Sequence, residues 1–354
     1  MVCVSGDRLP YDAVLVVSFG GPEKDEDVLP FLENVVRGRN VPRERLREVA
    51  GHYYHLGGRS PINDQMRALV EAVRAELESS AARVPVYWGN RNWRPLLAET
   101  LRGMAADGVR SAVAFIASAW SSYSSCRQYQ EDIARAREEV GPTAPRVDKT
   151  RVFYNHPGFI EAMADRVRAA RDVLAREGAG DVELIFTAHS IPLAMARSCR
   201  YASQLEQAGR LVAEAVGLDR WRLAYQSRSG PPEQPWLGPD VRDCLRELDR
   251  RPATRDVILA PLGFLSDHIE VVYDLDTQAA AVAREHGLNM VRAATVGTHP
   301  RFVAMIRDLI EERMGIQDSP RALGPDGAAE PTCAADCCPA PDRPAVAPGA
   351  GKPV

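Results

Sequence analysis

The chain has 354 residues, of which 45% are apolar and 26% charged, and its formal net charge is −4. This length exceeds the usual size of one hydrophobic core, so two packed domains are expected. Lys and Arg are scattered among Asp and Glu, which argues against nucleic acid as a partner. The start lacks a signal-peptide pattern, and no apolar run approaches the length of a transmembrane helix. We therefore expect a cytoplasmic protein.

Two parts of the chain repeat one order of elements. Residues 86–120 and 223–264 each read as strand, polar turn, helix and strand. Ahead of each lies a continuous apolar strand that stops at small residues and a proline, at 12–22 and 181–192. A helix is predicted from the segment HPGF onward, because apolar side chains recur there at steps of three and four. Its apolar stripe comprises Phe159, Met163, Val167, Ala170 and Leu174.

Continuous apolar strands that alternate with amphipathic helices are typical of parallel sheets covered on both faces. The predicted fold class is therefore α/β, with two similar doubly wound, Rossmann-like parallel-sheet domains facing a cleft. The expected organisation is an N-terminal segment at 1–12, a first domain at 13–150, a second domain at 151–315 and a Pro/Ala/Gly-rich tail at 316–354. The helical pattern at 300–314 is expected to close the second domain.

The carboxyl ends of the strands are where open α/β sheets bind ligands. His189 closes its strand, so its imidazole is expected to face the cleft as a neutral base or as a ligand for a metal ion. The alternative is a histidine that only bonds a neighbouring backbone carbonyl. Arg59 and Arg91 suit a carboxylate ligand, although either is also typical of a surface. No phosphate-binding glycine motif follows any strand, which argues against a nucleotide enzyme.

Acidic residues gather at a strand-to-helix junction in the second half. Asp267, His268 and Glu270 lie there together, and Asp274 follows one helical turn after Glu270. One interpretation is a capping box, in which Asp267 and Glu270 only satisfy backbone N–H groups at a helix start. The other is a track for a divalent cation, because Glu270 and Asp274 share one helix face.

Three of the seven cysteines, Cys333, Cys337 and Cys338, lie in the tail. Without a secretory signal, seven cysteines argue against a disulfide framework. A four-thiolate metal site would need a fourth cysteine, and the candidates are Cys3, Cys126, Cys199 and Cys244. Cys244 lies in an amphipathic helix pattern typical of a core, whereas Cys126 directly follows a strand end. An iron-sulfur cluster or a zinc ion would accept four thiolates, and free clustered thiols in a disordered tail would oxidise.

The order of motifs along the chain resembles the ferrochelatase family, in particular its bacterial members that insert iron into coproporphyrin III. The matching segments cover about residues 13–300 in unbroken order, and they are LVVSFGGPE, HYYHLGGRSPIN, GNRNWRP, FTAHSIP, QSRSGP, PWLGP and GFLSDHIEVVYDLD. The resemblance implies a chelatase fold. It also implies a lyase of haem biosynthesis that takes Fe²⁺ and a porphyrin as substrates and forms coprohaem.

The family also implies roles for particular residues. His189 and Glu270 would face each other across the macrocycle site, bind the substrate iron and handle the pyrrole protons. Asp267, His268 and Asp274 would form an iron track. The residues implied around the porphyrin are Tyr53, Ser60 and Tyr129 near its propionates, and Phe19 and Trp120 as apolar walls.

Ferrochelatases that carry a [2Fe–2S] cluster draw one ligand from the region of Cys126 and three from a C-terminal tail. The resemblance therefore implies a cluster held by Cys126, Cys333, Cys337 and Cys338, with structural zinc as the alternative. Two positions depart from the family. Phe19 replaces a tyrosine that can ligate the product iron in several bacterial relatives, and Gln278 replaces a third carboxylate of the acidic track.

Other functions compete with this interpretation. The nearest is a protoporphyrin IX ferrochelatase, because the two porphyrins differ by two propionates and the sequence shows no decisive count of basic partners for them. A cobalt or nickel chelatase would use the same fold, and a non-catalytic porphyrin carrier would need only a permanent axial ligand. Transient contacts with neighbouring enzymes of haem synthesis are the further partners expected.

Overall fold

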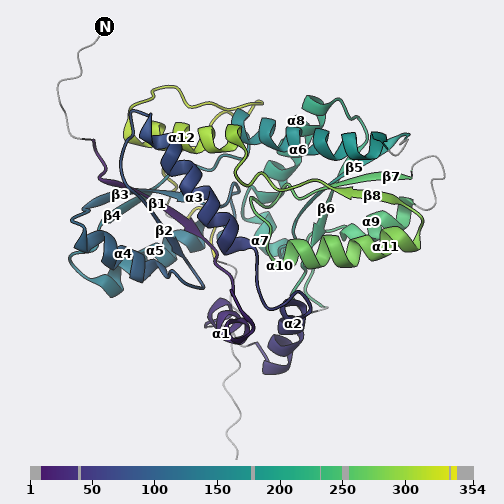
Figure 1. Cartoon of the computed structure of the whole chain (residues 1–354), viewed down its shortest axis with the longest axis horizontal. Helices are drawn as coiled ribbons and strands as arrows, with labels where there is room; N and C mark the ends of the chain where they lie inside the picture. The colour runs from purple at the N-terminus through teal and green to yellow at the C-terminus, as the bar shows by residue number, and fades with distance from the viewer. Residues whose placement is uncertain are drawn as a thin grey trace, which may run out of the picture.

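The protein is described by a computed structural model that covers residues 9–38, 41–176, 180–231, 233–248, 255–334 and 336–340. It has two halves side by side, each built on a four-stranded parallel sheet (Figure 1). Cys3 and most of the predicted segment 1–12 lie outside the described residues. The strands are β1 (Ala13–Ser18), β2 (Val86–Asn90), β3 (Ser111–Ile116), β4 (Arg146–Lys149), β5 (Val182–His189), β6 (Trp221–Gln226), β7 (Asp256–Ala260) and β8 (Asn289–Arg292).

The two sheets have the same topology. Their strand orders are β2-β1-β3-β4 and β6-β5-β7-β8, and every neighbouring pair is parallel. All residues of β1 and β7 are buried, as expected for strands covered on both faces. The predicted doubling and the α/β fold class are thereby confirmed.

Helices cover both faces of each sheet. The α-helices are α1 (Asp25–Val35), α2 (Arg43–His55), α3 (Ile62–Glu78), α4 (Leu97–Ala106), α5 (Gln128–Val140), α6 (Pro157–Arg176), α7 (Leu193–Arg197), α8 (Tyr201–Val216), α9 (Val241–Leu248), α10 (Ile269–Val271), α11 (Ala280–Glu285) and α12 (Pro300–Met314). Two π-helical segments are η1 (Tyr123–Arg127) and η2 (Val272–Ala279). The predicted apolar stripe of α6 is buried along its whole length.

One hydrophobic core runs through both halves. It joins side chains of β1 and β3 to side chains of β5 and β7, beneath α3, α6, α8 and α12 (Figure 1). Helix α12 lies against α3 and β3 of the first half as well as against α6, and Arg307 on α12 forms a 2.5 Å ion pair with Glu76 on α3. The helix therefore packs on both halves and not on the second alone. Its apolar residues complete the shared core.

The described part of the segment that follows α12 lies against the body of the protein. Asn155 Nδ2 donates to the carbonyls of Leu323 and Gly327, at 3.1 and 2.8 Å, and Tyr154 donates to Asp326 at 3.1 Å. At Gly324 φ is +79°, and a Cβ there would lie 2.4 Å from Gln207 Nε2, so this close approach requires glycine. Protein hydrogen bonds therefore hold the first part of the tail.

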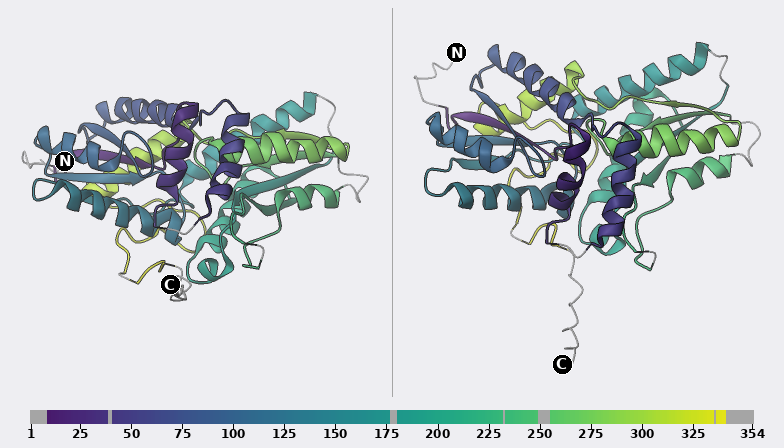
Figure 2. Two further views of the ribbon diagram at one scale, coloured as in Figure 1. Left: turned by 90° about the horizontal axis from the view of Figure 1, so that it is seen from below. Right: turned by 60° about the horizontal axis from the view of Figure 1, so that its bottom comes forward.

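Helices α1 and α2 form a separate pair at the carboxyl edge of the sheets (Figures 1 and 2). Their facing side chains build a small core that also includes Ile269 and Tyr273 of the second half. Figure 2 shows the pair lying between the two halves. The α1–α2 pair thus connects the halves next to the predicted site. Among the described residues, no helix is both long and apolar enough to span a membrane.

Candidate active site

His189 is the last residue of β5, the strand that lies between β6 and β7 in the second sheet. Its Nδ1 lies against the backbone carbonyl of Ser190. This contact favours the tautomer with the proton on Nδ1 and leaves a lone pair on Nε2. The alternative of a histidine that only bonds a backbone carbonyl therefore accounts for Nδ1 but not for Nε2, because Nε2 lies near a second partner.

That partner is Glu270, on α10 just after β7. The distance from His189 Nε2 to Glu270 Oε2 is 3.6 Å, and the side chains are 32% and 48% exposed. This distance is too long for a strong hydrogen bond but suits an ion pair once the ring is protonated. A macrocycle cannot lie between two groups in contact. The expectation that they face each other across the macrocycle is therefore wrong, and both groups present themselves from one side.

The capping interpretation of the acidic junction is also wrong. The residue before α10 is His268, which makes no side-chain capping hydrogen bond. Asp267 instead pairs with Arg292 at 3.1 Å, and its backbone N–H donates to Gln65 of α3 at 2.8 Å. Asp267 therefore has a structural role that connects the halves, while the carboxylate of Glu270 stays available.

Asp274 lies behind Glu270 in the π-helical segment η2. It accepts a hydrogen bond from Ser227, at the end of β6. Burial raises the pKa of Asp274 to about 6, and the charge of Glu270 adds to this effect. Burial likewise lowers the pKa of His268, whose ring packs edge-on against Phe264 at 4.9 Å. The site therefore combines an imidazole, an exposed carboxylate and a carboxyl group that can gain or lose a proton near neutrality.

A group of aromatic rings from the first half extends to this polar group through Tyr53. Phe31 of α1 lies 6.2 Å from Phe19, 5.9 Å from Tyr53 and 6.3 Å from Trp93, measured between ring centroids. The pKa of Tyr53 is raised by burial and, secondarily, by the charge of Glu270. Tyr53 is therefore near the polar group, and Phe19, at 36% exposed, is the exposed ring of the same aromatic group.

Three other residues implied around the porphyrin lie deeper than the implied contacts require. Trp120 is 1% exposed and donates from Nε1 to the Gly263 carbonyl at 3.2 Å. Tyr129 is buried under the Arg91 guanidinium, 4.4 Å from its ring centroid. Ser60 is buried beside Gly21. In this structure Trp120 and Tyr129 are part of the hydrophobic cores.

The two arginines considered as carboxylate ligands already have partners. The Arg91 side chain is 5% exposed and pairs with Asp132, and its guanidinium also lies 5.7 Å from the Phe19 ring. Arg59 is exposed and pairs with Asp64 at 2.5 Å. Arg91 therefore supports the aromatic rings of Phe19 and Tyr129, whereas Arg59 forms a surface ion pair.

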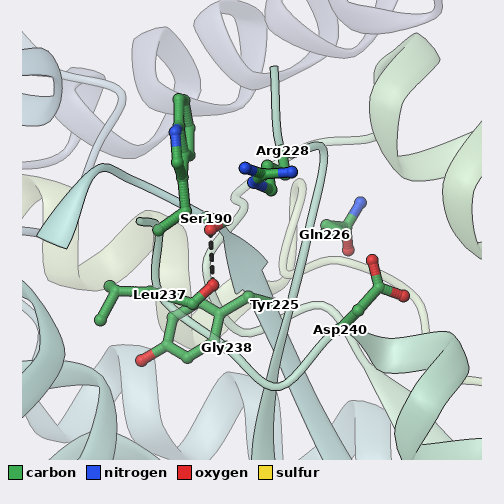
Figure 3. A pocket seen from close by; sticks show the side chains of 8 residues that line it. Ser190, Tyr225, Gln226, Arg228, Leu237, Gly238 and Asp240 are labelled. Atoms are coloured by element: carbon green, nitrogen blue, oxygen red, sulfur yellow. Dashed lines mark hydrogen bonds between the residues drawn. The ribbon is translucent and has the colours of Figure 1, made fainter. Parts of the chain in front are cut away.

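A cavity of about 210 Å³ opens next to the strand end that carries His189 (Figure 3). Its lining includes Ser190, Gln226, Arg228, Trp236 and Asp240. The volume is below the roughly 300–1,000 Å³ of typical small-molecule pockets, so this cavity is too small for a tetrapyrrole. Gln226 donates from Nε2 to the Glu270 carbonyl at 3.0 Å, and its buried Oε1 has no partner among the described residues.

The four cysteines predicted as ligands come together from distant parts of the chain. Cys126 in η1 hydrogen-bonds to Cys333, Cys333 to Cys337, and the sulfurs of Cys337 and Cys338 are 3.6 Å apart. The hydrogen bond from Cys126 and the charge of Lys149 lower the pKa of Cys333, although burial opposes this shift. Among the described residues, however, no group of three or more His, Cys, Asp or Glu side chains is arranged to hold a metal ion. The thiols meet in pairs.

Of the remaining cysteines, Cys244 is buried in the core under α9, as its pattern predicted. Cys199 is close enough to Cys337 and Cys338 for their charges to influence one another. Sequence reasoning also missed Ser227 and Gln226 as supports of Asp274 and Glu270. The signal was present, because both residues stand at the carboxyl end of a predicted strand.

The paired parallel sheets and the polar group at their carboxyl edge define the chelatase class of α/β proteins. The structure of SirB from Bacillus subtilis with Fe³⁺ has a TM-score of 0.55 to this chain at 11% identity, over 86% of this chain and 97% of that chain. DR2241 from Deinococcus radiodurans, described as similar to chelatases, has a TM-score of 0.53 at 18% identity, over 85% of this chain and 55% of that chain. These likenesses show the fold alone.

The chain belongs to the ferrochelatase family, whose model matches residues 11–314. A ferrochelatase of Rhodopirellula baltica is 53% identical, with 98% of each protein covered. A coproporphyrin III ferrochelatase of Streptomyces coelicolor is 48% identical over 98% of both proteins. Another, from Mycolicibacterium smegmatis, is 50% identical over 90% of this chain and 94% of that protein. The cysteine-bearing tail lies beyond the residues matched by the family model.

Proposed function

We propose that this enzyme inserts Fe²⁺ into coproporphyrin III, with His189 and Glu270 as its catalytic residues. The observation that carries the proposal is the 3.6 Å contact between these side chains at the carboxyl edge of the second sheet. Insertion exchanges one Fe²⁺ for the two pyrrole N–H protons of the free porphyrin, so the site needs proton acceptors beside a position for the metal. An imidazole, a carboxylate and a buried carboxyl group supply both requirements.

The roles follow from the geometry. His189 Nε2 carries the free lone pair and accepts a pyrrole proton, while Glu270 stabilises the imidazolium that results. Asp274, with a pKa of about 6, lies behind Glu270 and is poised to pass the proton on. The iron track is therefore reduced to Glu270, Asp274 and the half-buried His268, because Asp267 is held by Arg292. Gln278 accepts from Arg242 at 3.4 Å and extends no acidic path.

The aromatic group of Phe19, Phe31, Tyr53 and Trp93 is the proposed apolar wall for the porphyrin ring. Its open member is Phe19, whose side chain has no atom able to ligate iron. An axial tyrosinate at this position is therefore absent, so the product would have to be released without such a bond. The presence of both a base, His189, and a carboxylate, Glu270, favours an enzyme over a porphyrin carrier, which needs only a permanent axial ligand.

Coproporphyrin III is proposed as the substrate because several relatives at about half identity carry that name. Purified protein mixed anaerobically with Fe²⁺ and either porphyrin tests the assignment. We expect rapid conversion of coproporphyrin III, followed by the change of its absorption bands, and slower conversion of protoporphyrin IX. A preference for protoporphyrin IX would contradict the substrate, and a preference for Co²⁺ or Ni²⁺ over Fe²⁺ would contradict the metal.

We also propose that Cys126, Cys333, Cys337 and Cys338 hold a [2Fe–2S] cluster. The chemistry of the donors supports this proposal, because four thiols from two segments form a chain of pairwise contacts and Lys149 supplies a compensating positive charge. Closing this chain around a cluster would require the paired thiols to converge, since the described residues hold no ready-made metal group. Bound there, the cluster would cross-link η1 to the tail. A structural zinc ion is the alternative, since it also accepts four thiolates.

Replacing Cys126 with serine should remove this cross-link. Wild-type protein purified without oxygen is expected to be coloured and to contain about two irons and two sulfides per chain. Cys126→Ser should lose the colour, and protease should then cut the tail after residue 327, where the hydrogen bonds to Asn155 end. The matched control is Cys244→Ser, which removes a buried thiol from the α9 core. Colourless wild-type protein with about one zinc ion would favour zinc, and metal-free protein would contradict both.

The domain boundaries at 150 and 315, a cytoplasmic location and transient contacts with neighbouring haem-synthesis enzymes remain part of the proposal. The family membership supports the pathway. Separation of the labelled protein between membrane and soluble fractions tests the location.

A further inference from the structure

The end of β5 is held unusually firmly for a strand that leads into a loop. Ser190 N–H donates to the Gln226 carbonyl at 2.8 Å, and Ser190 Oγ donates to the Leu237 carbonyl at 2.7 Å (Figure 3). On the other side, Gly263 N–H donates to the Thr187 carbonyl at 2.9 Å. A Cβ at Gly263 would lie 2.6 Å from Ala188, so the turn after β7 presses directly on the residue before His189.

The peptide unit between His189 and Ser190 is bonded at both of its polar groups. Its N–H, from Ser190, joins the ladder to β6. Its carbonyl, from His189, accepts a 3.0 Å hydrogen bond from the hydroxyl of Tyr201, the first residue of α8. Because a peptide unit is planar, these two bonds together determine its orientation. The Ser190 carbonyl that follows is the group that contacts Nδ1 of the His189 ring.

Tyr201 itself is fixed by its surroundings. Its side chain is 3% exposed and lies edge-on to the Trp120 ring, with centroids 6.3 Å apart. Burial raises the pKa of Tyr201, so its hydroxyl stays protonated and remains a hydrogen-bond donor at neutral pH. Trp120 in turn donates to the Gly263 carbonyl, so the same cluster supports both sides of the strand end.

We propose that Tyr201 is a positioning residue for His189. Its hydroxyl holds the carbonyl of the His189–Ser190 peptide unit, and this unit leads directly into the next one, which carries the Ser190 carbonyl. The Ser190 carbonyl keeps the proton on Nδ1 and the Nε2 lone pair toward Glu270 and the porphyrin. Without the hydroxyl the ring would sample the other tautomer and other orientations. This inference rests on the proposed catalytic role of His189, but it makes a separate structural claim about the ring.

The test is Tyr201→Phe, which keeps the aromatic packing and removes the hydroxyl. The matched control is Tyr154→Phe, because Tyr154 also lies against Trp120, with centroids 6.4 Å apart, but bonds to Gln207 and Asp326 instead of His189. We expect kcat of Tyr201→Phe to fall about 10- to 100-fold, as for other partners that orient a reacting histidine, with little change in KM for the porphyrin. Tyr154→Phe should keep the wild-type kcat.

A spectroscopic measurement separates positioning from a general loss of structure. In ¹⁵N-labelled protein, the ring nitrogens of His189 should show one tautomer, protonated on Nδ1, in the wild type and in Tyr154→Phe, and a mixture in Tyr201→Phe. The double variant Tyr201→Phe/His189→Ala should be no slower than His189→Ala alone. An unchanged ring signal with normal kcat in Tyr201→Phe would overturn the inference, as would an equal further loss in the double variant.

The outcomes also distinguish this inference from the proposed function. If His189→Ala retained normal turnover, the catalytic role would fail, whereas the tautomer signal would still decide whether Tyr201 orients the ring. If His189→Ala were inactive and Tyr201→Phe had wild-type kcat and ring signals, only the positioning role would fail.

Discussion

His189→Ala is expected to abolish iron insertion, with a fall of about 10²- to 10⁴-fold in kcat, the range by which positioned acid–base groups accelerate reactions. The variant removes the lone pair that accepts the pyrrole proton and leaves Glu270 without its partner at 3.6 Å. Because the side chain is about one-third exposed and packs in no core cluster, the fold should be kept. Anaerobic turnover with Fe²⁺, together with the melting temperature, measures both effects.

The control for this experiment is His286→Ala, at the end of α11. It removes a second imidazole from the same half of the protein and should leave kcat unchanged. Porphyrin binding, followed by fluorescence quenching, should persist in His189→Ala because the aromatic wall belongs to other residues. Near-normal turnover of His189→Ala would refute the base assignment.

Glu270→Gln is the second substitution with a large expected effect. The change keeps the shape of the side chain but removes the negative charge that stabilises the imidazolium and receives the metal, so activity should fall by about 10²-fold or more. The side chain is half exposed and caps no helix, so the melting temperature should hardly move. Turnover and the melting temperature, measured on the same preparation, show whether the substitution affects activity or stability.

Glu285→Gln is the matched control, because Glu285 is an exposed carboxylate of α11 away from the polar group. It should behave as the wild type in both measurements. If Glu270→Gln lost stability and kept its turnover, the carboxylate would be structural and the proposed mechanism would need another acceptor. Asp274, whose pKa is already near 6, would be the next candidate.

The local patterns of the chain were sufficient to predict the two sheets. Continuous apolar runs produced strands buried on both faces, and apolar steps of three and four produced α6. The position of His189 at a strand end followed from the same patterns, because parallel strands place their carboxyl ends on one edge. The pattern could not show that α12 returns to the first half, since its apolar stripe suits either sheet equally well.

The tertiary structure was also needed to decide whether Glu270 caps a helix or is available for catalysis. The spacing of Asp267 and Glu270 is compatible with a capping box, and only the partner Arg292, brought in from β8, shows that Asp267 is used otherwise. In the same way, the count of cysteines left several candidates for the fourth thiol. Cys126 reaches Cys333 because hydrogen bonds to Asn155 and Tyr154 lead the tail across the body.

The sequence by itself determined the fold class, the doubling and the residues able to carry the chemistry, because these depend on local periodicity and on positions along single strands. The tertiary structure decided which of those residues meet. The contact of His189 with Glu270 depends on the neighbouring positions of β5 and β7 in the second sheet, and the support from Tyr201 depends on the packing of α8 against β5. The burial of Trp120 depends on how the two halves are set against one another. That arrangement comes from one hydrophobic core shared by both halves, and no single segment encodes it.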